Sequence, residues 1–221
     1  MKKIVLMASF LMSLSYAATA QMKFGLRLAP SLATNRVQDK KDGDGITYSN
    51  NGVGVRFSTG IIVDYFFSEN AALATGLWYT SKRAGIKSEV LGATSKYVYN
   101  TQFVQLPVGL KFFTNDLNDG MKLYFQAGAT IDVKISEKIK DWEPAVAGTP
   151  KPTEKAFLPV DIGVLLGAGV EMELAKDTKF FTGLNYNRGL LNMLRNSDNF
   201  KVRDYATSSF NLISLEAGLK F

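Results

Sequence analysis

The sequence contains neither cysteine nor histidine. Without cysteine the chain has no disulfides, so its stability has to come from another source, such as a closed hydrogen-bonded sheet. Without histidine it lacks the side chain that acid–base and nucleophilic sites use most often near neutral pH. The composition therefore points away from the commonest kinds of hydrolytic site.

Long apolar runs are also scarce, and the one that exists lies at the N-terminus. Lys2 and Lys3 precede the apolar segment 4–14, and Ala18-Thr19-Ala20 fits a cleavage site before residue 21. We expect residues 1–20 to be a signal peptide cleaved after Ala20 and residues 21–221 to be the mature domain. An uncleaved anchor is the alternative, but the run is shorter than the ~20 residues of a spanning helix.

The charges are numerous but scattered. Lys and Arg outnumber Asp and Glu by 26 to 20, and because two lysines leave with the predicted signal peptide, the mature chain carries +4. Basic residues never follow one another for more than two positions. Charge of this kind is typical of solvated surfaces, and we expect no nucleic-acid partner.

What the sequence does contain is apolar alternation with a period of two. In the last segment Ile213, Leu215, Ala217, Leu219 and Phe221 fall on one face, which is the periodicity of a β-strand. The same alternation is clear in 53–67, 122–136 and 158–174, and it holds in 180–190 except at Arg188. It is weaker in 22–33 and 73–82, and in 97–113 it is clear only in the second half.

Two residues interrupt this pattern. Pro107 cannot donate a hydrogen bond to a neighbouring strand, so we expect a bulge or a local irregularity there. Arg188 falls on the apolar face of its segment, and we expect it to lie beyond the lipid edge.

Short and long connections alternate along the chain. Segments 68–70, 114–120 and 175–178 are short, whereas 34–52, 83–96, 137–157 and 191–205 are long and polar. This is the pattern of an outer-membrane barrel with periplasmic turns and extracellular loops. A sheet can span hydrocarbon only if it closes and leaves no edge. The predicted fold is therefore all-β: an eight-stranded antiparallel up-and-down transmembrane β-barrel in the outer membrane, with both termini on the periplasmic side.

The face opposite the apolar one is charged and glycine-rich, so it should line the interior. An interior of eight strands is filled by side chains, and charges buried there should pair with one another. Carboxylates such as Asp132, Asp161, Glu171 and Glu173 would then pair with Arg56, Lys111, Lys122 and Lys134; a carboxylate-only hydrolase is the alternative. Lys220 is a further interior candidate. The predicted lumen polar network consists of Arg27, Arg56, Asp64, Lys111, Lys122, Asp132, Lys134, Asp161, Glu171 and Glu216.

Phenylalanines gather next to the short connections. We interpret them as an aromatic girdle at the periplasmic interface, with the core of a sandwich as the alternative. The set comprises Phe66, Phe67, Phe112, Phe113, Phe180, Phe181 and Phe221.

Several local motifs resemble a known family. These are Met22-Lys23-Phe24-Gly25-Leu26-Arg27, the strand from Leu106 to Phe112, Ala127-Gly128, Gly167-Ala168-Gly169 and the terminal Phe221. Over essentially the whole mature chain they resemble the PorT-type outer-membrane β-barrel proteins of Bacteroidetes. The resemblance implies insertion by the barrel assembly machinery, with Phe221 as the recognition signal. It leaves the function open, since some members are linked to protein secretion and gliding.

The sequence shows no catalytic site, cofactor site or metal site. Small outer-membrane barrel enzymes, such as lipid A deacylases and omptin proteases, resemble one another in using histidine, so we expect no enzyme. The loop Asp39 to Gly45 carries carboxylates, but Ile46 takes the place of a calcium ligand. Trp142 is a candidate contact for another protein or a surface glycan, or it packs on neighbouring loops.

The leading hypothesis is a structural or interaction role without catalysis, in a surface or protein-secretion assembly. The expected partners are outer-membrane lipid, the barrel assembly machinery and an envelope protein bound by the extracellular loops. A small porin-like conduit for ions or solutes is the first alternative, because charges face the lumen. A soluble periplasmic carrier of the lipocalin type is the second.

Overall fold

The computed structural model describes residues 22–40, 45–117, 120–148, 151, 155–196 and 202–221. The predicted signal peptide lies outside these residues. In the described part, no helix has both the length and the apolar character needed to cross a membrane. The elements are β1 (Met22–Asp39), β2 (Ile46–Asn50), β3 (Gly54–Ser68), β4 (Ala71–Val90), β5 (Ala93–Phe113), β6 (Met121–Glu143), β7 (Val160–Ala175), β8 (Thr178–Gly189), α2 (Val202–Tyr205) and β9 (Ala206–Lys220).

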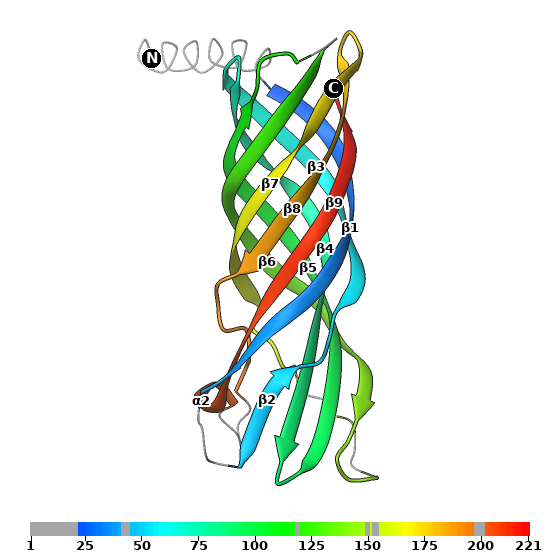
Figure 1. The fold of residues 1–221 in the computed structure, drawn as a ribbon, viewed down its shortest axis with the longest axis vertical. Helices are drawn as coiled ribbons and strands as arrows, with labels where there is room; N and C mark the ends of the chain where they lie inside the picture. The colour runs from blue at the N-terminus through cyan, green and yellow to red at the C-terminus, as the bar shows by residue number, and fades with distance from the viewer. Residues whose placement is uncertain (1–21, 41–44, 118–119, 149–150, 152–154, 197–201) are drawn as a thin grey trace, which may run out of the picture.

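Eight of the strands close into a barrel (Figure 1). Sequential strands pair antiparallel, β1 joins β9, and the β4–β5 pairing completes the ring, while β2 pairs with β4 outside it. The predicted fold class and the count of eight ring strands are confirmed, including the strands whose alternation is weak. The described chain ends lie at the end of the barrel with the short turns (Figure 1).

The strands are strongly tilted, and the register gives the amount. Thr34 of β1 pairs with Asn211 of β9, which pairs in turn with Arg188 of β8. Followed from strand to strand around the whole ring, this series of pairs comes back to β1 at Phe24, ten residues before Thr34. This stagger corresponds to a tilt of roughly 40° for eight strands. Residues on one hydrogen-bonded row therefore lie at different depths along the barrel axis.

The outer face of the ring is a continuous apolar belt. On β1 it runs from Phe24 to Leu32, and the residues at the alternate, outward positions of this segment are all exposed. Nine residues at ~3.3 Å each and a tilt of ~40° span roughly 23 Å, close to the height of a lipid-facing band. Above Leu32 the outward positions of β1 become polar, beginning with Thr34 and Arg36. The belt thus ends near the level of Thr34.

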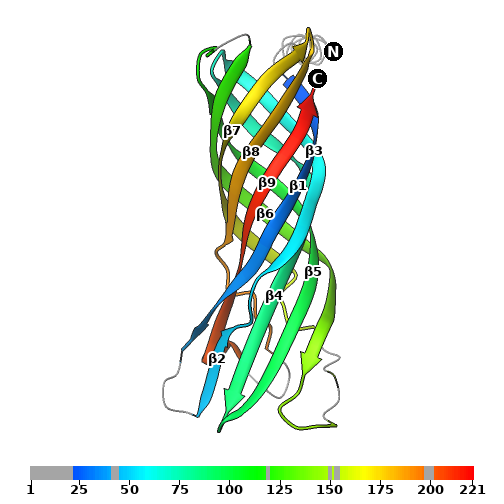
Figure 2. The same ribbon diagram turned by 45° about the vertical axis from the view of Figure 1, so that its right-hand side comes forward.

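Several strands continue well beyond this belt. The predicted loop 83–96 is wrong, because β4 and β5 stay paired up to a two-residue turn at Leu91-Gly92. Likewise β6 extends to Glu143, β1 extends to Asp39, and part of the first predicted loop forms β2. Figure 2 shows the outer parts of β4 and β5 projecting from the barrel with β2 beside β4, while the end of β1, which pairs with β9, lies apart from them. The apolar alternation ends at the edge of the lipid-facing belt, whereas the backbone pairing of the strands continues beyond it.

Pro107 does not cause a bulge. The register with β6 is continuous through Pro107 and Thr130. On the β4 side the ladder is interrupted opposite Gly76 and Leu77 and resumes in the same register. The expected irregularity is therefore a local gap in one ladder, because proline removes one donor without adding a residue.

Two apolar clusters fill the interior, one near each end. The inner cluster consists of Ile62, Ala72, Trp78, Phe113, Tyr124, Leu165 and Phe181, with Phe66 packed against it. Phe113 and Phe181 are buried, whereas Phe67, Phe112 and Phe221 are exposed on the outside. The prediction that all these phenylalanines form a girdle is therefore wrong for the inward members of the pairs, because adjacent residues in a strand point to opposite faces.

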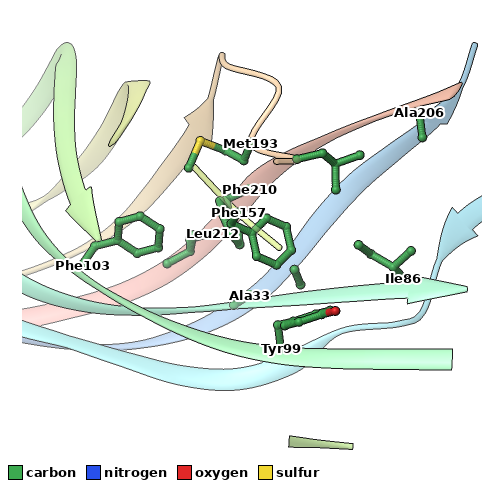
Figure 3. Close-up of a cluster of buried hydrophobic side chains, with 11 residues drawn as sticks. Ala33, Ile86, Tyr99, Phe103, Phe157, Met193, Ala206, Phe210 and Leu212 are labelled. Atoms are coloured by element: carbon green, nitrogen blue, oxygen red, sulfur yellow. The ribbon is translucent and has the colours of Figure 1, made fainter. Parts of the chain in front are cut away.

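The outer cluster lies among the strands near the extracellular end (Figure 3). Phe157, from the β6–β7 connection, and Met193 and Leu194, from the β8–β9 connection, are buried in it. Phe157 and Leu194 form an isolated antiparallel bridge. Long connections that we expected to be polar loops thus place apolar side chains inside. The other members are Ala33, Ala84, Ile86, Tyr99, Phe103, Ala206, Phe210 and Leu212.

Candidate functional site in the barrel interior

A four-membered charge cluster lies in the inner half of the lumen. Lys220 contacts Asp64 at 2.6 Å and also pairs with Glu171. Lys111 lies 3.6 Å from the same carboxylate oxygen of Asp64. All four side chains are buried. Removing a buried charge from water is costly, and close opposite charges with hydrogen bonds offset that cost.

A second pair, Arg27 and Glu216, continues this network. Arg27 Nε donates to Glu216 at 2.6 Å, and its other arm donates to Ser58 Oγ at 2.9 Å. The Arg27 guanidinium also lies 3.9 Å from the ring centre of Trp78. Tyr124 Oη donates to the remaining Glu216 oxygen at 2.7 Å. Both carboxylate oxygens of Glu216 are therefore satisfied.

The third cluster lies closer to the extracellular end and is less complete. Lys82 donates to Asp132 at 2.5 Å and lies 3.7 Å from Asp161. All three residues are fully buried. The Lys82 ammonium also lies 4.8 Å from the ring of Phe103 and 5.4 Å from that of Phe210. One lysine thus balances two carboxylates beneath the outer apolar cluster.

Most of the predicted lumen residues are placed inside, but their partners differ from those expected. Asp132 and Asp161 pair with Lys82, and Glu171 pairs with Lys220 and Lys179. None of these carboxylates forms a direct ion pair with Arg56, Lys111, Lys122 or Lys134 among the described residues, so the expected direct pairs are wrong, although Lys111 and Glu171 belong to the same cluster. Glu173 is exposed rather than inward. The buried members of the predicted network are Arg27, Asp64, Lys111, Asp132, Asp161, Glu171 and Glu216.

The remaining three predicted residues lie at the ends of the barrel. Lys122 pairs with Asp116 at 3.4 Å near the short β5–β6 turn. Lys134 pairs with Glu137 at 2.5 Å and donates to the carbonyl of Phe157. Arg56 donates to the side chain of Asn100 at 3.0 Å. These contacts are structural and do not join the buried clusters.

Sequence reasoning missed Lys82. We expected its strand to end at this residue, so Lys82 was not assigned to either face. The signal was present, since Trp78, Thr80 and Lys82 continue the inward alternation. Counting on by two from Trp78 and Thr80 along the strand identifies Lys82 as the next inward residue.

The lumen holds little free volume. A cavity of about 30 Å³ beside Trp78, Lys111 and Glu216 has room for roughly two water molecules. Elsewhere inward polar side chains of neighbouring strands bond to one another, as Ser58 does with Thr80 and Thr80 with Gln105. The interior is thus a packed core.

Loss of the Tyr124 hydroxyl is expected to destabilise this core. Tyr124→Phe leaves one buried Glu216 oxygen without its donor, which should lower the free energy of unfolding by about 1–3 kcal/mol. Urea unfolding in lipid vesicles, followed by tryptophan fluorescence, measures the difference. Tyr186→Phe is the matched control, because Tyr186 faces outward and its change should be near zero. Equal effects of the two variants would contradict the role given to the Glu216 contact.

The belt, the closed ring and the packed interior agree with comparisons with known proteins. The model of a family described as an outer membrane protein beta-barrel domain matches residues 17–195. The chain belongs to this family. As an outer-membrane β-barrel protein it has its apolar belt in lipid and its short turns on the periplasmic side.

Solved structures show the same fold at low sequence identity. Neisserial surface protein A is 13% identical, with a TM-score of 0.52 over 90% of this chain and 96% of that one. Ail of Yersinia pestis is also 13% identical, with a TM-score of 0.39 over 90% and 97%. No curated protein matches the sequence. The similarity to Neisserial surface protein A supports the barrel architecture and carries no information on a ligand.

Trp142 and Phe221, the two residues predicted to contact partners, are both placed. Trp142 lies on β6 rather than in a loop, and its ring centre is 4.4 Å from that of Tyr97. Packing on neighbouring elements is therefore what the structure shows, and partner binding by Trp142 stays a prediction. Phe221 is exposed, and its N–H donates to the Phe24 carbonyl at 2.7 Å. Its role as an assembly signal also stays a prediction.

No metal site emerges from the part of the chain that the structure describes. There, no group of three or more His, Cys, Asp and Glu side chains could hold a metal ion. Residues 41–44 of the loop weighed as a calcium site lie outside the described residues. Asp39, the first carboxylate of that segment, accepts a hydrogen bond from the Tyr48 N–H at 3.1 Å.

Proposed function

We propose that this protein is a closed, non-enzymatic outer-membrane barrel that presents a folded extracellular sheet to an envelope or surface partner. The observation that carries the proposal is the filled lumen. Buried ion pairs occupy its middle, and an apolar cluster lies near each end. A barrel built in this way serves as an anchor, because solute transport would require these side chains to move.

The extracellular sheet is the part that remains available for function. The outer parts of β4, β5 and β6 pair with one another up to their ends, with two register shifts between β5 and β6, and they rest on the outer apolar cluster. Leu91, at the tip of the β4–β5 hairpin, is 92% exposed and has a φ of 49°. Backbone strain at an exposed apolar residue is a reason to look for a binding role. The PorT-type resemblance suggests that the partner belongs to a surface or protein-secretion assembly.

Conductance measurements separate this proposal from the porin-like alternative. We expect purified protein in planar bilayers to show no reproducible unitary current, because buried ion pairs and two apolar clusters occupy the described lumen. A stable channel current in most insertions would contradict the closed barrel. Insertion itself is checked by the gel mobility of boiled and unboiled samples from the same vesicles.

A soluble lipocalin-type carrier does not fit the orientation of the side chains. Its apolar residues would point inward around a ligand, whereas here Leu26, Leu215 and Leu184 point outward and are more than half exposed. Retention of the protein in carbonate-washed membranes is expected for the same reason.

A further inference from the structure

We propose that a groove on the outer wall of the barrel, containing Arg36 and Arg188, binds the phosphate of a lipid headgroup in the outer leaflet. The groove has a volume of about 230 Å³. It lies across β1, β9 and β8, which are neighbours in the sheet. Its lining consists of Arg36, Gln38, Arg188, Gly189, Leu190, Leu191, Asn192, Thr207 and Ser209.

The two arginines flank the same strand. Arg36 is paired in register with Ser209, and Arg188 is paired with Asn211, so they approach β9 from opposite sides. Both side chains are exposed on the outside of the wall. Arginine side chains are long enough to converge over a strand from its two neighbours, and their planar groups match phosphate oxygens in a bidentate manner.

The groove lies at the outer margin of the apolar belt. On the three strands that form it, the last outward apolar residues before the change to polar ones are Leu32, Ile213 and Tyr186. Acyl chains pack on these residues, so the headgroups of the same lipids lie at the level of the groove. Leu190 and Leu191 add apolar surface on its far side.

Among the described residues, no acidic side chain neutralises the charge of the groove. No acidic residue lines it, and among the ion pairs of the described residues none involves Arg36 or Arg188. Arg83, which lies on another part of the wall, contrasts with them, because it donates to the carbonyls of Gly52 and Asn51. Two guanidinium groups that pair with no described carboxylate, at a lipid interface, are complementary to an anionic headgroup.

This placement also explains why Arg188 breaks the sequence pattern. It occupies an outward position on β8 directly beyond Tyr186, at the edge of the belt. An arginine there can direct its charge towards the headgroups while its methylene groups remain against lipid. Arg188 thus interrupts the apolar alternation because it lies where the barrel wall passes from the acyl chains to the headgroup region.

Native mass spectrometry of the detergent-purified barrel tests the proposal with two lipid probes, diphosphorylated lipid A and the same lipid A after removal of its phosphates. We expect the phosphorylated form to bind at least about tenfold more tightly. Arg36→Gln together with Arg188→Gln should reduce binding of the phosphorylated form by roughly tenfold or more. The matched control is Lys138→Gln with Lys140→Gln, which removes the same charge from exposed positions of β6 and should leave binding unchanged.

Three outcomes would overturn the proposal. Equal affinity for the two lipid probes would show that the phosphate is not recognised. An equal loss in the Lys138 and Lys140 control would show that only net charge matters. Inorganic phosphate that competes as well as the phosphorylated lipid would indicate a site for a soluble anion. Heat-modifiable gel mobility of each variant confirms that the barrel is folded.

Discussion

Replacing Lys82 by methionine is expected to lower the free energy of unfolding by about 3–5 kcal/mol. Lys82 is the cation that balances Asp132 and Asp161, and all three side chains are fully buried. Lys82→Met keeps the length and packing of the side chain but leaves two carboxylates without a counter-charge. The measurement is urea unfolding in lipid vesicles with tryptophan fluorescence as the probe.

A rescue experiment shows whether the effect comes from charge. Adding Asp132→Asn and Asp161→Asn to Lys82→Met removes the stranded charges with little change of shape, so most of the lost stability should return. Lys138→Met, at an exposed position of β6, should change the stability by less than about 0.5 kcal/mol. If Lys82→Met behaved like this control, the cluster would not be stabilising the barrel.

Truncating Phe157 to alanine is expected to weaken the extracellular half by about 3–5 kcal/mol. The ring is fully buried and touches the rings of Tyr99 and Phe210 at 5.1 Å and 5.4 Å between centroids. Because Phe157 belongs to a connection rather than a strand, its segment is held by this ring and by a few hydrogen bonds, such as that from Lys134 to the Phe157 carbonyl, rather than by a full ladder. The cavity left behind would release both this connection and its bridge partner Leu194.

The two tryptophans allow this loss to be located. Trp78 is buried in the inner cluster, and Trp142 packs on Tyr97 near the outer cluster. In a Trp78→Phe background, where Trp142 is the only tryptophan, Phe157→Ala should lower the urea midpoint of unfolding strongly. Where Trp78 is the only tryptophan, the same substitution should lower the midpoint far less. Val146→Ala, at an exposed extracellular residue, is the control with no expected shift. A uniform shift of both probes would mean that the two halves unfold as one unit.

Several features of the protein could be predicted because they depend on one local rule. Residues such as Leu215 and Leu219 alternate with inward ones, and this period of two determines which side chains face lipid. The short connections at 68–70 and 175–178 fix the antiparallel neighbours. Closure into eight strands then follows, because an open edge is not tolerated in hydrocarbon.

The ends of the strands could not be predicted from the same rule. Segments such as 83–90 and 137–143 are polar on their outward face because they are in water, so the lipid-facing signal disappears there. They remain strands since the backbone pairing continues and their other face packs on the outer cluster. Phe157 and Met193 gave no periodic signal at all, because their segments are irregular.

The sequence by itself determined a membrane barrel with charges inside, because the alternation of apolar and polar side chains can be read from consecutive residues. Only the tertiary structure decided which charges meet. Lys82 finds Asp132 and Asp161 across the lumen, and Arg36 and Arg188 come together around β9. Both results depend on which strands are neighbours in the ring and on the register between them, which bring together side chains that are far apart in the chain. No local pattern contains these registers, because they are a property of the sheet.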